Sequence, residues 1–397
     1  MENIELLSPA GDWESLEAAA DFGADAVYLG GDMLQLRAAK AAFDRETLAK
    51  AAEYLHSRGK KLYVTVNCFA FSDEIEPARE YARFLRDAGA DAAIISDLGV
   101  LRAFGEAAPE LDRHISTQAS CMNYMSAQVY WDMGASRVVL ARELSLENIA
   151  ELRAKAPRGL ELEAFVHGAM CMAYSGRCII SSCLAGRSGN RGECAQPCRW
   201  NYRLEEEKRP GEYFPIEEYE NGTAILSSHD LCCVEFLDKI ADAGVCSFKI
   251  EGRMKTAYYV ATAVNAYRRA MDGSDSTESC RRELECLKHR PYASGFYFGE
   301  LKNGHLNDGH YSQTCTFVGR AVDSSAGSIT IEQRNNFGIG DRLEILSPGE
   351  PIKAFTAEEM WDGTGTPTDR APHPKEHVTV KCPYDVRPGA FIRRRDD

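Results

Sequence analysis

Short apolar segments alternate with helical segments over about the first 270 residues of the chain. One pattern recurs four times: a helix end, then a glycine, then a short apolar run. The glycine suits the left-handed position that follows many helices, and the apolar run is typical of a strand. The four copies are DFGADAVYLGG (21–31), DAGADAAIISD (87–97), DMGASRVVLAR (132–142) and DAGVCSFKIEG (242–252), and further strands are predicted within 4–10, 61–69, 114–120 and 160–168.

Strands that alternate with helices indicate βαβ units and a parallel sheet. Eight or nine such units fit a TIM-like (β/α)8 barrel better than an open sheet. After residue 300 the pattern changes to short β-type runs with Gly and Asn turns, as in 309–350 and 377–395. The sequence therefore predicts an α/β fold with two domains: a barrel over 1–305, with a Cys-rich loop insertion at 167–200, and a small C-terminal β-barrel over 306–397.

Polar residues follow the predicted strands, at the end of such barrels where functional groups gather. Each of them alone is equally well explained as a helix cap, but a set of six around one rim favours a site. The six are Asn67, Asp97, Gln118, Arg142, Glu251 and Arg253.

The N-terminal sequence and the net charge limit the expected location of the protein and its expected partners. The N-terminus lacks a basic region followed by an apolar core, so no secretory signal is expected, and no apolar run approaches the length of a membrane span. We therefore expect a cytoplasmic protein without a membrane partner. The net charge of −14 disfavours a general nucleic-acid binder, so DNA is not an expected partner. A local basic site for an RNA remains compatible with that charge.

Five of the fourteen cysteines lie within 167–200, directly after a predicted strand. Six residues separate Cys171 from Cys178, fifteen separate Cys178 from Cys194, and three separate Cys194 from Cys198. Four thiolates suit either an iron–sulfur cluster or a structural zinc. The absence of a CxxC pair disfavours zinc without excluding it, and unliganded thiols remain a third interpretation. Cys183, Cys232 and Cys233 are alternatives for one of the four.

A cysteine beside His167 also raises the hypothesis of a Cys–His protease. That pairing needs one cysteine and leaves three unexplained. The HExxH helix of a zinc protease does not occur in the sequence.

Several long motifs resemble one known family. EAFVHGAMCMAYSGRCIIS (163–181) resembles the signature of the U32 family, once classed as peptidases or collagenases. GECAQPCRWNY, LSSHDLC, SFKIEGRMKTAYYVATAVNAYRRAMD and SGFYFGE continue the resemblance in order, so that it covers roughly residues 4–300. The C-terminal β-domain is typical of one branch.

The resemblance implies an oxygen-independent hydroxylase with a Cys-ligated [4Fe–4S] cluster. Members of the family hydroxylate tRNA wobble uridine, a ribosomal RNA cytidine or a quinone precursor. This chain is most similar to the tRNA branch, which makes 5-hydroxyuridine with prephenate as hydroxyl donor. The resemblance thus implies tRNA as partner, with a paired U32 paralogue as a further one. A non-catalytic partner subunit and a U32-type protease stay as alternatives.

The resemblance also implies residue roles. It assigns Cys171, Cys178, Cys194 and Cys198 as cluster ligands, with Cys232 as the alternative fourth ligand and zinc as the alternative metal. Arginine forks suit the two carboxylates of prephenate. We expect Arg37, Arg142 and Lys255 to bind the cosubstrate, and His167 and Arg253 to act in catalysis, although Arg142 and Arg253 also suit rim ion pairs and His167 a structural role.

An unstacked uridine calls for aromatic or guanidinium planes. The candidates are Arg199, Trp200, Tyr202 and Tyr258, although core packing explains most aromatic residues equally well. The terminal Arg393, Arg394 and Arg395 are either a basic RNA contact or a solvated tail.

Overall fold

The computed structural model describes residues 4–36, 43–171, 180–187, 189, 193–197, 200, 218–219, 222–223, 229–299, 311–325 and 327–396. Contacts divide the chain into two compact units. The first comprises Met1–Ala20, Ala24–Val260 and His289–Tyr311, and the second comprises Asp21–Gly23, Ala261–Lys288 and Ser312–Asp397. The last part of the barrel sequence, from residue 261, thus groups with the C-terminal strands.

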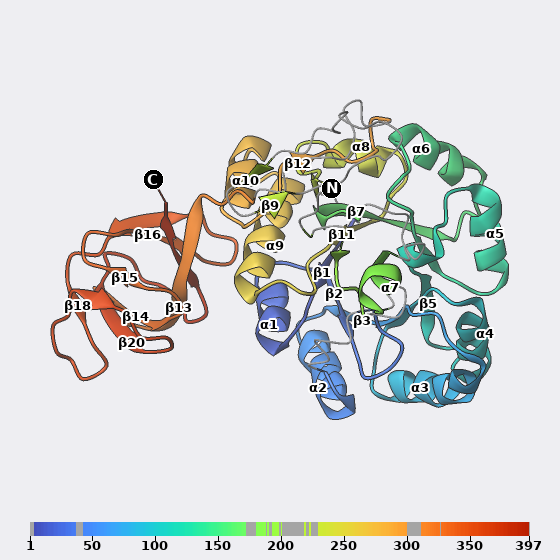
Figure 1. Ribbon diagram of the computed structural model, residues 1–397, viewed down its shortest axis with the longest axis horizontal. Coiled ribbons are helices and arrows are strands. Elements are labelled where there is room, and N and C mark those ends of the chain that lie inside the picture. The colour runs from blue at the N-terminus through green and yellow to red at the C-terminus, as the bar shows by residue number, and fades with distance from the viewer. Residues whose placement is uncertain are drawn as a thin grey trace. The chain divides into compact units, whose positions relative to one another are not determined.

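Eight parallel strands of the first unit close into a barrel (Figure 1). The strands run in chain order around the ring, and the eighth pairs with both the first and the seventh, as in Glu5 with Ser247 and Glu163 with Ser247. The predicted TIM-like barrel is confirmed. The strands are β1 (Glu5–Pro9), β2 (Ala26–Gly30), β3 (Lys61–Val66), β4 (Ala92–Ile95), β5 (Asp112–Ile115), β6 (Arg137–Val139), β7 (Glu161–Ala169) and β11 (Ser247–Ile250).

Helices connect these strands on the outside of the ring (Figure 1). Side-chain caps begin several of them: Asp44, Asp97 and Ser145 each accept a backbone N–H of the first turn, which satisfies a donor that the helix itself leaves open. These connecting helices are α1 (Trp13–Asp21), α2 (Arg45–His56), α3 (Ile75–Asp87), α4 (Leu98–Ala107), α5 (Tyr124–Asp132), α6 (Leu146–Lys155) and α8 (Leu237–Asp242), with 3₁₀ turns at Ser72–Glu74 and Thr117–Ala119. The short α7 (Ile180–Ala185) belongs to the Cys-rich insertion, and α9 (Ala257–Asp272) and α10 (Thr277–Leu284) follow the last barrel strand.

Two short strands extend the barrel sheet beyond β7. β10 (Asp230–Cys232) pairs antiparallel with the last residues of β7, and β12 (Tyr292–Ala293) pairs parallel with β10. The pairing sets Cys232 opposite His167. This antiparallel extension lies at the carboxyl end of the barrel, where the Cys-rich loop begins. A separate two-residue pair joins β8 (Glu218–Tyr219) and β9 (Gly222–Thr223).

The second unit contains an antiparallel sheet of seven strands, in the order β17-β16-β21-β13-β14-β20-β18. Phe355 of β17 and Met360 of β18, at the two ends of that order, belong to one buried cluster. The sheet therefore curls around its core, as expected of a small β-barrel domain. The strands are β13 (Cys315–Ser325), β14 (Ser328–Gln333), β16 (Arg342–Leu346), β17 (Lys353–Thr356), β18 (Met360–Trp361), β20 (His377–Lys381) and β21 (Phe391–Arg395), and β15 (Phe337–Gly338) pairs with β19 (Arg370–Ala371).

The arginine-rich end of the chain is part of this domain and not a solvated tail. Arg393 lies in β21 with none of its surface exposed, and its Nη2 is 2.9 Å from Glu283 Oε2 and 2.7 Å from Glu344 Oε2. Arg395 pairs with Glu344 at 2.8 Å. A buried charge is retained where opposite charges and hydrogen bonds compensate its desolvation. Arg393 is therefore a structural residue and is not available to contact an RNA.

Among the helices that the structure describes, none combines the length and the apolar content needed to cross a bilayer.

Candidate functional site

The six polar residues expected at the rim all follow carboxyl ends of barrel strands, so the parallel topology places them at one end of the barrel. Two of them have structural roles. Asp97 caps α4 through Val100 N at 3.0 Å, and Asn67 Oδ1 accepts the Leu36 N–H at 3.2 Å. Asp97 is therefore a helix cap, as one of the two interpretations predicts, whereas Asn67 caps no described helix and instead holds the backbone at Leu36.

Arg142 follows β6 and lies over the Phe165 ring, with its guanidinium carbon 3.9 Å from the ring centroid. Its Nη1 donates to Ala169 O at 2.8 Å, and its Nη2 is 3.5 Å from Glu251 Oε2. The side chain is 13% exposed, and its buried Nε has no hydrogen-bond partner among the described residues. Arg142 thus makes the rim ion pair, while one N–H of its fork stays open to an acceptor.

Glu143 is a further carboxyl at this rim, directly after Arg142 in the sequence. Arg142 pairs with Glu251 instead, and the buried Oε2 of Glu143 has no hydrogen-bond partner among the described residues. Burial raises the pKa of this carboxyl above its usual value, against the opposing charge of Arg142. Its position directly after Arg142 was the available signal in the sequence.

Arg253 follows β11 and is 6% exposed. Its Nη1 donates to Thr65 Oγ1 in β3, so the side chain reaches across the barrel mouth. A Cβ at Gly30 would lie 2.6 Å from that same Nη1 and closer still to Gln35 Oε1, so a larger residue there would displace both side chains. The neighbouring Lys255 is half-buried, with Nζ 5.1 Å from the Tyr259 ring centroid. Arg37, the third expected cation, lies outside the described residues.

His167 lies in β7 and is 1% exposed. Its ring packs against Tyr259 and Tyr292, with centroid distances of 5.8 and 5.6 Å. Tyr292 in turn stacks on His289 at 3.8 Å, and Tyr259 donates its hydroxyl to Glu251 O. His167 is therefore held by an aromatic layer at the carboxyl end of β7, a contact set that spacing along the chain does not reveal.

The Cys-rich loop begins at this same place. Cys171 follows β7 directly and is exposed, and Cys194 is partly exposed. The Cys194 Sγ accepts the Gln196 N–H at 3.4 Å, a contact of the kind that tunes a ligating thiolate. Cys183 is exposed on α7, and Cys232 is buried in β10. Cys178 and Cys198 lie outside the described residues, and within the described ranges no set of three metal-ligating side chains converges.

A buried ion pair supports the start of that loop. Arg290, 1% exposed, donates from Nη2 and Nε to Asp230 Oδ1 at 2.7 and 2.9 Å. The same Nη2 lies 3.4 Å from Met170 O, the carbonyl that precedes Cys171. Arg290 therefore ties β10 to the first residues of the Cys-rich loop. Sequence reasoning missed this pair, because its members are 60 positions apart.

The barrel interior contains a second ionic cluster, below the rim. Arg137 Nη1 lies 3.1 Å from Glu163 Oε2 and also contacts Glu5. Lys249 Nζ is 2.7 Å from Glu163 Oε1. In the sequence, the only indication of this ionic cluster is the presence of charged residues inside otherwise apolar strands. Its role in the barrel is structural, since it joins β1, β6, β7 and β11.

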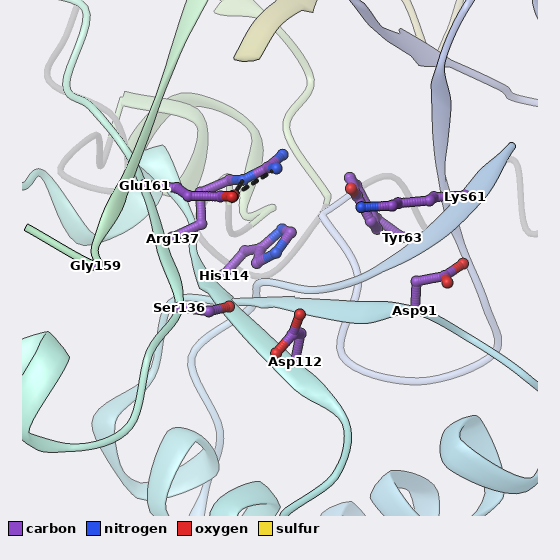
Figure 2. Close-up of a pocket in the computed structure, with 9 residues that line it drawn as sticks. All are labelled: Lys61, Tyr63, Asp91, Asp112, His114, Ser136, Arg137, Gly159 and Glu161. Carbon is purple, nitrogen blue, oxygen red and sulfur yellow. Dashed lines mark hydrogen bonds and ion pairs between the residues drawn. The ribbon is translucent and has the colours of Figure 1, made fainter. Parts of the chain in front are cut away.

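A cavity of about 190 Å³ opens at the amino ends of the strands, below this cluster. Figure 2 shows His114 between Lys61 and Arg137, with Asp112 and Ser136 at its edge. Burial and the charges of Arg137 and Lys249 hold the pKa of His114 well below its usual value. In barrels of this type the amino end serves stability and the carboxyl end serves chemistry. The rim with Arg142, Arg253, His167 and the cysteine loop is therefore the candidate site.

The closed parallel barrel, with cysteines and arginines at its carboxyl rim, defines the class of protein: a TIM-like barrel with a candidate site at that rim. Sequence comparison then gives the family. The profile of Peptidase family U32 matches residues 11–307, and that of the Peptidase family U32 C-terminal domain matches residues 313–393. The chain belongs to peptidase family U32.

Three proteins that are similar to this chain are named for different activities. The "tRNA hydroxylation protein P1" of Bacillus subtilis (strain 168) is 35% identical, over 98% of this chain and 94% of that protein. The "23S rRNA 5-hydroxycytidine C2501 synthase" of Escherichia coli (strain K12) is 38% identical, over 68% of this chain and 39% of that protein. The "Collagenase" of Porphyromonas gingivalis (strain ATCC BAA-308 / W83) is 32% identical, over 100% of this chain and 99% of that protein.

Proposed function

We propose that this chain hydroxylates uridine in tRNA to 5-hydroxyuridine. The observation that carries the proposal is the similarity over nearly the whole chain to a protein named for tRNA hydroxylation. The second named activity among the relatives, hydroxycytidine synthesis in 23S rRNA, is also hydroxylation of a pyrimidine in RNA. RNA hydroxylation is thus common to both names, and tRNA is the substrate of the relative that matches the longer share of both chains.

A [4Fe–4S] cluster fits the donor set at the rim. Cys171, Cys178 and Cys194 would hold it, with Cys198 or Cys232 as the fourth ligand. The exposed Cys171 and the hydrogen-bonded sulfur atom of Cys194 support this assignment. When bound, the cluster supplies the redox chemistry that no side chain provides.

The rim also suits an anionic oxygen donor, for which we propose prephenate. The open Nε of Arg142 and the guanidinium of Arg253 present positive charge toward the barrel mouth. A carboxylate accepts hydrogen bonds from charged N–H donors of this kind more strongly than a neutral acceptor does. Arg142 and Arg253 would orient the donor, and Lys255 would add a third charge. His167, fixed by Tyr259 and Tyr292, would hold or move a proton beside the cysteine loop.

Nucleoside analysis of RNA from a strain that lacks the gene tests the proposed function. We expect 5-hydroxyuridine to disappear from digested tRNA and to return when the gene is supplied on a plasmid. An unchanged tRNA with loss of 5-hydroxycytidine from 23S rRNA would transfer the assignment to the second substrate. Unchanged nucleosides in both RNAs, with cleavage of collagen by the purified protein, would overturn the proposal in favour of a peptidase.

The oxygen donor is tested in the same strain background. Blocking prephenate synthesis in the wild type should abolish 5-hydroxyuridine in tRNA. Adding prephenate to purified protein and unmodified tRNA should form 5-hydroxyuridine. Persistence of 5-hydroxyuridine in the blocked strain would contradict the assignment of prephenate while leaving the tRNA substrate intact.

A further inference from the structure

Two buried cysteines of the second unit lie in direct contact, although they are 29 positions apart in the sequence. Cys286 follows α10, and Cys315 begins β13. Their sulfur atoms are 2.9 Å apart, and neither residue has exposed surface. The Thr314 N–H donates to Glu285 O at 3.2 Å, which aligns the two backbone segments. The contact is therefore built into the fold of this unit and does not depend on chance rotamers at a surface.

The surroundings distinguish the two thiols. The Cys315 thiol points at Cys286 Sγ, which also accepts the Thr314 hydroxyl at 3.7 Å and lies 3.9 Å from Arg395 Nη2. The hydrogen bond from Cys315 lowers the pKa of Cys286, with help from the charge of Arg393 and against the effect of burial. The same hydrogen bond, with burial, raises the pKa of Cys315. Cys286 is thus the more acidic thiol of the pair, and Cys315 donates the hydrogen bond between them.

We propose that Cys286 and Cys315 form a redox-active dithiol, which a small hydroperoxide oxidises to a disulfide that links the end of α10 to β13. A small oxidant is required because both thiols are fully buried, so the disulfide of another protein cannot reach them. Neither residue belongs to the cysteine loop of the barrel rim. The inference therefore stands independently of the proposed hydroxylase activity.

The chemistry balances in two steps. The Cys286 thiolate attacks the peroxide O–O bond, forms a sulfenic acid and releases hydroxide from hydrogen peroxide. The Cys315 sulfur then attacks the sulfenic sulfur, the S–S bond forms, and the sulfenic hydroxyl leaves as water with the proton of Cys315. Two electrons pass from the two sulfurs to the peroxide. The geometry favours the second step, because the sulfur atoms already lie nearer to each other than nonbonded sulfur atoms ordinarily do.

Peptide mapping of the full-length protein tests the proposal. Trypsin releases Cys286 in ELECLK (283–288) and Cys315 in NGHLNDGHYSQTCTFVGR (303–320), and neither peptide contains another cysteine. After titration with hydrogen peroxide and alkylation under denaturing conditions, we expect the two peptides to be linked and two hydrogens lighter than their sum. Reduction with dithiothreitol should separate them.

Matched variants test whether the linkage is specific to Cys286 and Cys315. Cys280→Ser and Cys382→Ser each remove another fully buried cysteine of the same unit and should leave the linked peptide in place. Cys286→Ser should abolish the linked peptide. Recovery of both wild-type peptides only as separately alkylated species after peroxide would overturn the proposal, and so would a linkage of Cys286 to any other cysteine. The wild-type result decides even if a variant fails to fold.

Discussion

Glu163 and Glu161 contact the same arginine from very different environments, and this contrast gives a quantitative prediction. Glu163 is fully buried and accepts Lys249 Nζ at 2.7 Å and Arg137 Nη1 at 3.1 Å. Glu161 contacts Arg137 Nη2 at 2.7 Å, but its side chain is 50% exposed. Replacing either carboxylate by the isosteric amide removes one charge and preserves the shape of the side chain.

The expected losses differ several-fold. Removing one partner of a buried ion pair costs about 3–5 kcal/mol, because the remaining charge stays buried without compensation. Glu163→Gln does this to Lys249, for which the described residues offer no other carboxylate partner. An exposed pair contributes about 0–1 kcal/mol, so Glu161→Gln should cost no more than that.

Urea unfolding measures both losses in the free energy of unfolding. It is monitored by far-UV circular dichroism, which reports mainly on the helices of the barrel. With an m-value of about 3 kcal/mol/M, Glu163→Gln should lower the midpoint by about 1–1.7 M, and Glu161→Gln by less than about 0.4 M. Equal shifts for the two variants would refute the reasoning from burial. A shift below about 0.3 M for Glu163→Gln would show that the interior cluster does not stabilise the barrel.

Three further predictions follow from the structure. Arg290→Met should reduce the metal content of the purified protein, because Asp230 loses its partner and Met170 O loses its donor beside the cysteine loop; metal analysis against Arg102→Met, a control at a side chain that is 78% exposed, checks this. Burial raises the pKa of Glu344, but its hydrogen bonds and ion pairs with Arg395 and Arg393 outweigh that effect and lower the pKa below its ordinary value of 4.5. The stabilisation by Glu344 is therefore present above about pH 4.5 and is lost as the pH falls through the lowered pKa. Glu344→Gln should reduce the dependence of the urea unfolding midpoint on pH in this acidic range. A Cys286–Cys315 disulfide should stabilise the second unit by about 3–4 kcal/mol, from a closed loop of about 30 residues; urea unfolding of oxidised and reduced protein measures the difference.

The barrel was predictable because its signals are local. A glycine after a helix followed by an apolar run appears four times, and each copy contains or precedes an observed strand, as in β2, β4, β6 and β11. In a parallel barrel, the residue after each strand must lie at the same end. Position along the chain was therefore enough to bring Arg142, Glu251 and Arg253 to one rim.

The contacts that fix the site were not predictable from the same pattern. The packing of His167 against Tyr292 depends on the addition of β10 and β12 to the sheet, and its packing against Tyr259 depends on the start of α9. No local periodicity encodes these contacts. Arg393 illustrates the opposite error. Three successive arginines near the end of a chain suggest solvent, but strand alternation turns the first of them into the core to meet Glu283 and Glu344.

We expect cysteines at the carboxyl rim of the barrel to hold an iron–sulfur cluster. Iron and acid-labile sulfide in anaerobically purified protein test it most directly, in the wild type, in Cys171→Ala, Cys198→Ala and Cys232→Ala, and in Cys382→Ala as a buried control. We expect about four iron and four sulfide per chain in the wild type and in the control. Cys171→Ala should contain neither iron nor sulfide. One of Cys198→Ala and Cys232→Ala should also lose both, and that variant identifies the fourth ligand. Stoichiometric zinc without iron in the wild type would contradict the account.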